Sequence, residues 1–265
     1  MNMSEKRNYI TIMNFSGIYK YEKFYKDENV IWLDFSGLQG KNCYCDDSAE
    51  KLIRERIKNM SPQGLHFIDS GNYHYATKFW IDKIKEKFNL IVIDYHSDMQ
   101  QPAFYSILSC GSWIAQCLEN NTYIDKIILM GISKEQKKAL TGKYKDRLIC
   151  IDNEQIKKDD FLELQGLNRK YPVYISIDKD VLSRNILETN WSQGDMKLTE
   201  LKSILHGIIP KQNIIGIDLC GECANEEGKL RAVQKNDEVN ANLLRFLKNE
   251  RNLCRMNCHT VQYKS

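Results

Sequence analysis

Short apolar runs rich in β-branched residues recur along the chain, and amphipathic stretches separate many of them. The apolar runs predict strands at residues 9–13, 30–33, 65–68, 90–93, 126–130, 148–151, 173–177 and 214–217. The amphipathic stretches predict helices at residues 49–59, 75–88, 107–119, 199–206 and 237–249. Strands that are apolar throughout and alternate with helices are typical of a parallel sheet covered on both faces. We therefore predict an α/β fold, a three-layer α/β/α arrangement with a mostly parallel sheet of about eight strands.

The chain shows no internal division. No repeat, low-complexity tract or Pro/Gly-rich linker interrupts its 265 residues, so we expect one domain over residues 1–265. No apolar run reaches the length of a membrane span and the start lacks a signal-peptide pattern, which favours a cytoplasmic protein without a membrane partner. A net charge of +3, with lysines spread among acidic residues, argues against nucleic acid as a partner.

Acidic and histidine side chains follow four of the predicted strands. Ligands of open parallel sheets bind beyond the carboxyl ends of the strands, so these positions are where chemistry is expected. The residues that follow the four strands in this way are His74, then Asp94, His96 and Asp98, then Asp178 and Asp180, and finally Asp218 and Glu222. We expect one acidic site at this edge of the sheet.

Spacing and charge favour two metal ions at this site. Alternate residues of an extended chain lie on one side, about 6.6 Å apart, so Asp94 and Asp98 would be about 13 Å apart if the segment stayed extended. Metal pairs lie about 3.5–4 Å apart, so a curled segment that serves two ions fits best. Four clustered aspartates also need cations to offset their charge. Oxygen ligands with two imidazoles suit Mn²⁺, and Fe²⁺, Co²⁺ or Zn²⁺ would also fit.

Each of these residues alone would carry little weight. A single aspartate after a strand is usually a turn or helix-cap residue, and a single histidine is usually structural. We assign His66, His206 and His259 to structural roles because the sequence shows no comparable partners for them.

The cysteines suggest an alternative metal site. Cys220 and Cys223 form a Cys-x-x-Cys pair, and Cys254 and Cys258 follow near the C-terminus. Together they could form a zinc site. Unrelated reduced thiols are the favoured interpretation, because the second pair lies in a polar terminal segment.

Three segments resemble signatures of the arginase/agmatinase (ureohydrolase) family. The family has a Gly-Gly-Asp-His turn, an Asp-x-His-x-Asp segment and a Ser-x-Asp-x-Asp segment. Here these read Ser70-Gly71-Asn72-Tyr73-His74, Asp94-Tyr95-His96-Ser97-Asp98 and Ser176-Ile177-Asp178-Lys179-Asp180. The resemblance implies an eight-stranded parallel sheet, a homo-oligomer, and two divalent metal ions held by His74, Asp94, His96, Asp98, Asp178 and Asp180.

Several positions depart from the family pattern and indicate a divergent branch. Tyr73 replaces the aspartate before the turn histidine, and Val181-Leu182-Ser183 replaces the usual Asp-Pro. The histidine that arginases carry after the second signature is missing from Ser109-Cys110-Gly111-Ser112-Trp113. The family's guanidinium-binding glutamate follows its strand aspartate by three residues, whereas Glu222 follows Asp218 by four.

The resemblance implies a binuclear-metal hydrolase that acts on a guanidino or amidino C–N bond and releases urea and an amine. We expect Asp98 to transfer the proton and Glu222 to bind the guanidinium group. Residues 99–113 would shape the pocket, with Trp113 and Trp191 at its mouth or packed under a loop. The substrate stays open between small guanidino compounds and peptidyl arginine. The alternatives are a single-metal deacetylase-like amidohydrolase and a non-catalytic binding protein of the same fold.

Overall fold

The predicted parallel sheet is confirmed. The computed structural model describes residues 10–101, 107–140, 142, 144, 147–158 and 170–261, with side chains described as far as Glu250. Eight strands form one sheet in the order β2-β1-β4-β10-β9-β5-β7-β8, and every neighbouring pair runs parallel. In chain order they are β1 (Ile10–Asn14), β2 (Val30–Asp34), β4 (Gly64–Phe67), β5 (Phe88–Ile93), β7 (Ile124–Ile132), β8 (Leu148–Asp152), β9 (Val173–Asp178) and β10 (Ile214–Cys220).

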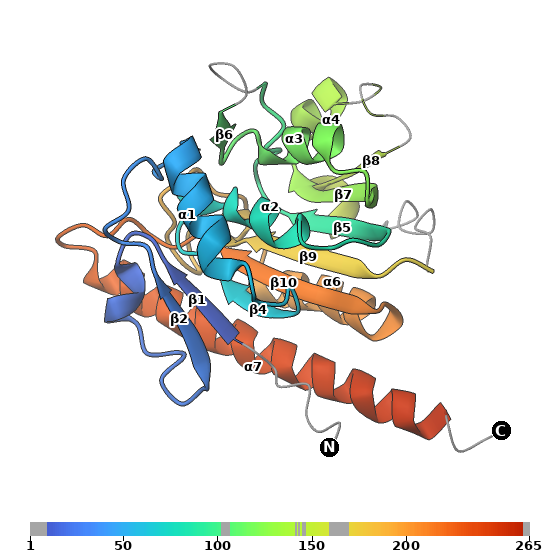
Figure 1. The fold of residues 1–265 in the computed structure, drawn as a ribbon. Coiled ribbons are helices and arrows are strands. Elements are labelled where there is room, and N and C mark those ends of the chain that lie inside the picture. Colours follow the sequence, from blue (N-terminus) through green and yellow to red (C-terminus); the bar gives the residue numbers. More distant parts are fainter. Residues whose placement is uncertain are drawn as a thin grey trace, which may run out of the picture.

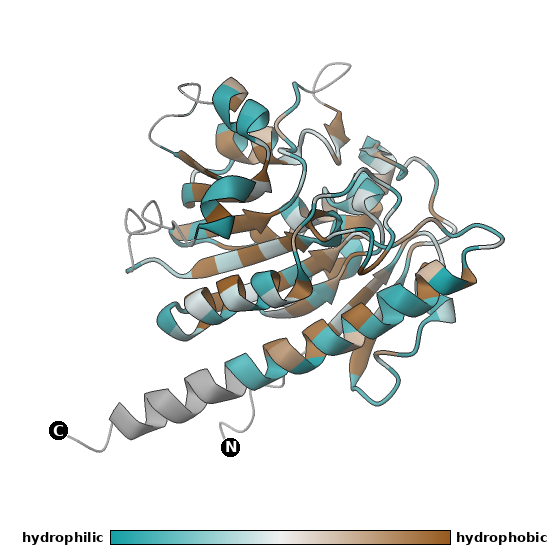
Figure 2. Cartoon of the chain, turned by 180° about the vertical axis from the view of Figure 1, so that it is seen from behind, coloured by the Kyte–Doolittle hydropathy of each residue, from teal (hydrophilic) through white to brown (hydrophobic). Residues whose placement is uncertain are grey.

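Helices cover both faces of this sheet and complete the three layers (Figures 1 and 2). One face packs against α1 (Asp47–Ile57), α2 (Ala76–Ile81) and α3 (Trp113–Asn120), and the other against α6 (Leu198–Ile208) and α7 (Leu230–Val261). Two shorter helices, α4 (Lys134–Leu140) and α5 (Asn153–Lys157), flank β8 in the chain.

The alternation of side chains along each strand produces two separate cores. In β5, Ile91 and Ile93 belong to the core under α6 and α7, whereas Leu90 and Val92 belong to the core under α1, α2 and α3. Successive strand residues point to opposite faces, so a strand that is covered on both sides must be apolar at every position. This requirement explains the continuous apolar runs of the sequence.

The predicted bounds of three helices were wrong by more than a few residues. The helix predicted at 75–88 ends at Ile81, because Phe88 is fully buried and begins β5. The helix predicted at 107–119 begins only at Trp113, because Leu108–Ser109 forms β6 and pairs antiparallel with β3 (Tyr44–Cys45). The last helix extends beyond 237–249 in both directions.

The sheet order places the carboxyl ends of four strands side by side. Strands β4, β10, β9 and β5 are consecutive neighbours, although they are far apart in sequence. The polar segments that follow these strands therefore meet at one edge, where ligands of open α/β sheets bind.

Asp69, directly after β4, connects this edge to the end of β1. Its carboxylate accepts hydrogen bonds from the backbone N–H groups of Phe15 (2.8 Å), Ser16 (2.7 Å) and Ser70 (2.7 Å). Its backbone lies in the left-handed region at φ 45°, which few residues other than glycine adopt. The fully buried side chain thus stabilises a strained turn just before the candidate site.

Replacing Asp69 should destabilise the fold. In Asp69→Ala the three backbone N–H groups lose their acceptor inside the protein, so we expect a loss of roughly 3 kcal/mol in the free energy of unfolding. Urea denaturation measures this change. The exposed Asp27→Ala variant is the control and should stay within about 0.5 kcal/mol of the wild type; equal stability of the two variants would contradict the assignment.

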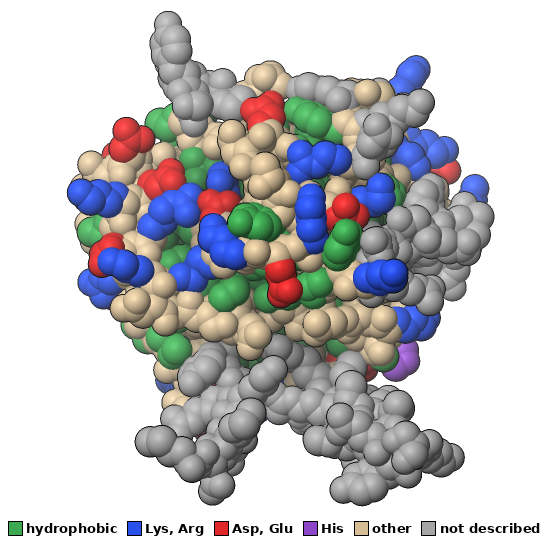
Figure 3. Space-filling view, turned by 45° about the vertical axis from the view of Figure 1, so that its right-hand side comes forward, with side chains coloured by type: hydrophobic (Ala, Val, Ile, Leu, Met, Phe, Trp, Pro, Cys, Tyr) green, Lys and Arg blue, Asp and Glu red, His purple; other side chains and the backbone are tan. Residues whose placement is uncertain are grey.

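Neither the helices nor the charge pattern of one surface is unusual in the described part of the chain. None of its helices has both the length and the apolar character that crossing a membrane requires. On the face shown in Figure 3, lysine and arginine side chains lie among aspartates and glutamates.

Candidate metal centre

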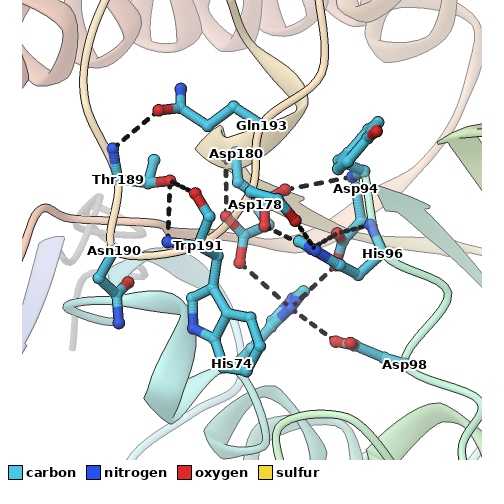
Figure 4. A network of polar contacts seen from close by, with 12 residues as sticks. His74, Asp94, His96, Asp98, Asp178, Asp180, Thr189, Asn190, Trp191 and Gln193 are labelled. Carbon is cyan, nitrogen blue, oxygen red and sulfur yellow. Dashed lines mark hydrogen bonds and ion pairs between the residues drawn. The ribbon is translucent and has the colours of Figure 1, made fainter. Parts of the chain in front are cut away.

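The structure brings all six predicted metal-ligand positions to the common edge of the sheet (Figure 4). They come from the segments that follow β4 and β5 and from the end of β9. The aspartates and the turn histidine are buried, whereas the side chain of His96 is 26% exposed. The six residues are His74, Asp94, His96, Asp98, Asp178 and Asp180.

A first cluster surrounds His74. The histidine ends a short 3-10 turn, Gly71–Tyr73, and its Nδ1 atom faces three carboxylates. Nδ1 lies 3.2 Å from Asp94 Oδ2, 3.1 Å from Asp98 Oδ2 and 3.6 Å from Asp178 Oδ2. These donors come from three separate segments and surround a volume that one cation can fill.

A second cluster surrounds His96 and shares Asp94 with the first. His96 Nδ1 lies 2.8 Å from Asp180 Oδ2 and 3.8 Å from Asp94 Oδ1. The two oxygens of Asp94 therefore face different clusters, Oδ2 the first and Oδ1 the second. A carboxylate with its two oxygens directed in this way can bridge two ions.

Hydroxyl groups orient both histidines. His74 Nε2 lies 2.9 Å from the Ser176 hydroxyl, which also contacts the Thr77 hydroxyl at 3.2 Å. His96 Nε2 lies 2.8 Å from the Ser192 hydroxyl. Because each Nε2 faces a hydroxyl group outside the two clusters, Nδ1 is the ring atom that faces the carboxylates and would bind a cation.

The protein alone does not satisfy the charges and polar atoms of this site. Burial, followed by the charge of neighbouring carboxylates, raises the pKa values of Asp94 and Asp180 well above their ordinary range. His74 Nδ1 and Asp94 Oδ2 are also buried without a hydrogen-bond partner. Divalent cations would offset the carboxylate charge and would coordinate both of these atoms, so the donor set fits them.

The arginase-family model matches residues 64–224, which is more than half of the chain. The chain belongs to the arginase family. An uncharacterised protein of Thermotoga maritima is 32% identical over 243 residues, covering 90% of this chain and 89% of that protein.

Three solved structures of other proteins illustrate the likeness in fold. A hypothetical agmatinase from Burkholderia thailandensis has a TM-score of 0.66 at 15% identity, covering 93% of this chain and 88% of that one. Formimidoylglutamase from Bacillus subtilis has a TM-score of 0.64 at 14% identity, covering 94% and 89%. A Trypanosoma cruzi formiminoglutamase with Mn²⁺ has a TM-score of 0.62 at 11% identity, covering 90% and 94%.

The two tryptophans expected at the pocket mouth differ in position. Trp113 is fully buried and donates from Nε1 to Asp98 Oδ2 at 2.7 Å, so it orients a carboxylate instead of facing a substrate. Trp191 is 36% exposed, lines the cavity and lies edge-on to His96, with 5.6 Å between ring centroids. Of the two, only Trp191 is placed to contact a bound molecule.

Glu222 does not face the cavity. Its fully buried side chain forms an ion pair with the equally buried Lys179, and Asn240 of α7 donates to the same carboxylate at 2.9 Å. At the arginase family's usual glutamate spacing, three residues after Asp218, this chain has Gly221 with φ +94°. A Cβ there would lie 2.4 Å from Asp178 Oδ1, so no side chain fits. This geometry runs against the expected guanidinium-binding role of Glu222.

Lys179 should therefore act in stability. Lys179→Met leaves Glu222 buried beside a second buried acid, Glu22, without a positive partner, and we expect a loss of roughly 3–5 kcal/mol in unfolding free energy. The measurement is urea denaturation, with the exposed Lys58→Met as control. A Lys179→Met variant as stable as the wild type would show that the Lys179–Glu222 ion pair contributes nothing to the free energy of unfolding.

Cys220, the last residue of β10, is a candidate ligand that sequence reasoning assigned to another pattern. Its Sγ atom lies 2.9 Å from Asp178 Oδ2, and Cys220, His74 and Asp178 form a third group of potential donors. Cys223 belongs to the opposite core, beneath α6 and α7. The two cysteines therefore do not face one site, and Cys254 and Cys258 lie outside the described side chains. The available signal was the position of Cys220 at the carboxyl end of a central strand.

The remaining histidines also gain partners through the tertiary structure. His66 was expected to lack them, but its Nδ1 atom lies 2.7 Å from Asp218 Oδ1 and 3.0 Å from the Tyr174 hydroxyl, inside the sheet. His206 lies 3.0 Å from Glu250, and the His259 side chain is outside the described part. The expectation for His66 was wrong about its partners, although its burial away from the cavity is consistent with a structural role.

A cavity of about 290 Å³ opens over the two clusters. Aromatic and amide side chains line it together with the aspartates, and none of the described lining residues is a lysine or arginine. Residues 102–106 of the loop expected to shape the pocket lie outside the described residues. The lining residues outside the two clusters include Tyr44, Gln100, Gln136, Trp191 and the cysteines Cys43 and Cys110.

Cys43 should be a reactive thiol at the edge of this cavity. A hydrogen bond with Cys110 lowers the pKa of Cys43 to about 7, because it favours the thiolate. We expect the rate at which iodoacetamide modifies Cys43 to rise with pH, with a midpoint near this value. In Cys110→Ala the midpoint should move to about pH 8.5, the value of an ordinary cysteine. Mass mapping of the modified peptide gives the midpoint. Buried Cys45, whose pKa is raised to about 12, is an internal control and should stay unmodified; unchanged behaviour in Cys110→Ala would contradict the assignment.

Proposed function

We propose that the protein is a metal-dependent hydrolase that cleaves a C–N bond of a guanidino or amidino group with two divalent cations. The observation that carries this proposal is the division of the Asp94 oxygens between two histidine-containing clusters. Membership of the arginase family supports it, as does the structural likeness to agmatinase, arginase and an amidino hydrolase.

The donor sets indicate which residues would hold the cations. His74, Asp98 and Asp178 would hold one with Asp94, and His96 and Asp180 would hold the other with the same aspartate. Donors that are mostly carboxylate oxygens, with two imidazoles, suit Mn²⁺. Cations bound there supply Lewis acidity and a water molecule of lowered pKa.

Asp98 is the residue that we assign to proton transfer. It borders the cavity, and its carboxylate is oriented by the Trp113 indole at 2.7 Å. Its backbone is held in the left-handed region at φ 49°, and its carbonyl accepts a hydrogen bond from Ile114 N–H. A carboxylate fixed in this position would accept a proton from water and deliver it to the leaving amine.

Substrate recognition must differ from the family pattern, because Gly221 cannot supply a carboxylate. The carboxylates that line the cavity are Asp94, Asp98, Asp178 and Asp180, all within the two clusters. Trp191 and Tyr44 offer exposed aromatic surface at the cavity instead. A planar guanidinium group would be attracted to such ring faces. We therefore propose a guanidino or amidino substrate, free or within a peptide, whose cationic end lies against Trp191.

A guanidino-binding protein without activity is the second candidate. The observation that favours it is the same lack of a recognition carboxylate at Gly221. A single-metal amidohydrolase has less support, because the six residues form two clusters and not one. Metal content and turnover separate all three.

Metal analysis and a substrate panel test the proposal. Purified protein loaded with Mn²⁺ should contain two ions per chain and release urea or ammonia from at least one of arginine, agmatine, formimidoyl compounds and arginine-containing peptides. Asp94→Asn should reduce turnover by more than about a hundredfold, because this residue contacts both clusters.

The exposed Asp27→Asn variant is the matched control and should retain full turnover. If the protein binds two ions and a panel compound tightly but hydrolyses none of these compounds, it is a binding protein and not an enzyme. One ion per chain with turnover would instead favour the single-metal enzyme.

A further inference from the structure

Cys220 places a sulfur atom among the donors of the first cluster. Its Sγ atom, His74 Nδ1 and Asp178 Oδ2 all lie within 4.8 Å of one another. The three residues are almost completely inaccessible, at 1%, 1% and 3% exposure respectively. Donor atoms bound at about 2.0–2.3 Å to one cation span distances of this size.

The pairing of β10 with β9 holds the thiol in this position, because Cys220 lies opposite Asp178 in the register of the two strands. Gly221 turns the chain at φ +94°, so close to β9 that a Cβ would lie 2.7 Å from the Lys179 backbone nitrogen. This turn directs Glu222 toward α7 and leaves Cys220 as the β10 side chain beside Asp178. The strand therefore contributes sulfur to the centre, and no carboxylate.

One of the two donor atoms beside the thiol has no hydrogen bond. Asp178 Oδ2 accepts one from Cys220, whereas His74 Nδ1 is buried and neither accepts nor donates one. Cys220 is thus part of a group of inward-facing donors and is not an isolated cysteine in an apolar core.

We propose that Cys220 binds, as a thiolate, the cation of the His74 cluster, an inference that rests on the proposed function for the presence of that cation. On binding, the S–H bond is replaced by a sulfur–metal bond, the proton leaves to solvent, and no group changes oxidation state. Sulfur makes the two clusters chemically unequal. The His74 cluster, with nitrogen, oxygen and sulfur donors, favours Zn²⁺, Co²⁺ or Fe²⁺ over Mn²⁺, whereas the His96 cluster, with nitrogen and oxygen only, suits Mn²⁺.

Cobalt spectroscopy tests this ligand directly. Metal-free, full-length protein is titrated with Co²⁺, and a thiolate-to-cobalt charge-transfer absorption should appear in the near ultraviolet. The band should be absent in both Cys220→Ser and Cys220→Ala. It should persist in Cys223→Ser, and also in Cys43→Ser and Cys110→Ser, which remove the thiols that line the cavity.

X-ray absorption of the wild type loaded with one Zn²⁺ gives a readout that needs no variant. A sulfur neighbour at about 2.3 Å is expected. In Cys220→Ser, the affinity for Zn²⁺ relative to Mn²⁺ should fall by more than about tenfold.

The outcomes separate this inference from the proposed function. Bound metal with only nitrogen and oxygen neighbours in the wild type would overturn the thiolate ligand and leave the two-cation hydrolase intact. A charge-transfer band that survives in Cys220→Ala would also overturn it, by assigning the sulfur to another cysteine. A protein that binds neither Co²⁺ nor Zn²⁺ nor Mn²⁺ would overturn both proposals.

Discussion

The crowding of buried carboxylates at the ends of two neighbouring strands is the constraint on which the rest of the site depends. Asp94 and Asp178 end adjacent strands, so their charges cannot be moved apart without changing the order of the sheet. Burial raises the energy of each charge and proximity raises it further. The surrounding structure relieves this cost only in part. N–H groups of the backbone or of Trp113 donate to each of the four aspartates, but the histidines face inward and hydroxyl groups lie at their outer nitrogens. Divalent cations would offset the charge that remains.

The end of β9 and the 3-10 turn that follows it, Lys179–Val181, contribute to two buried networks. Asp178 and Asp180 face the candidate metal centre, whereas Lys179 between them points toward α7 and pairs with Glu222. A lysine beside clustered aspartates would be expected to neutralise them. Instead, the 3-10 turn directs it to the other core, where it stabilises a second buried charge. The acidity of the metal site is therefore preserved although a cation lies next to it in sequence.

The departures from the arginase family concentrate where the substrate and one cation would bind. Gly221 excludes a recognition carboxylate, and Cys220 brings sulfur to the position beside Asp178. The cavity is lined by the aspartates of the family pattern, and the partly exposed Trp191 adds an aromatic side chain to its lining. These features lie next to each other in the chain: the β10–β9 register places Cys220 beside Asp178, and the glycine turn that follows directs Glu222 away. The predicted metal ligands thus keep the family pattern, whereas the positions proposed for substrate recognition depart from it.

The sequence by itself determined the eight strands, the parallel sheet and the six clustered positions from His74 to Asp180. Buried parallel strands must be apolar throughout, and polar residues at their carboxyl ends are local signals that need no knowledge of packing. Only the tertiary structure decided that Trp113 supports Asp98 from beneath, that Glu222 pairs with Lys179, and that Cys220 joins the first cluster. Each of these outcomes depends on a side chain's direction after a turn and on partners distant in sequence, neither of which residue spacing specifies.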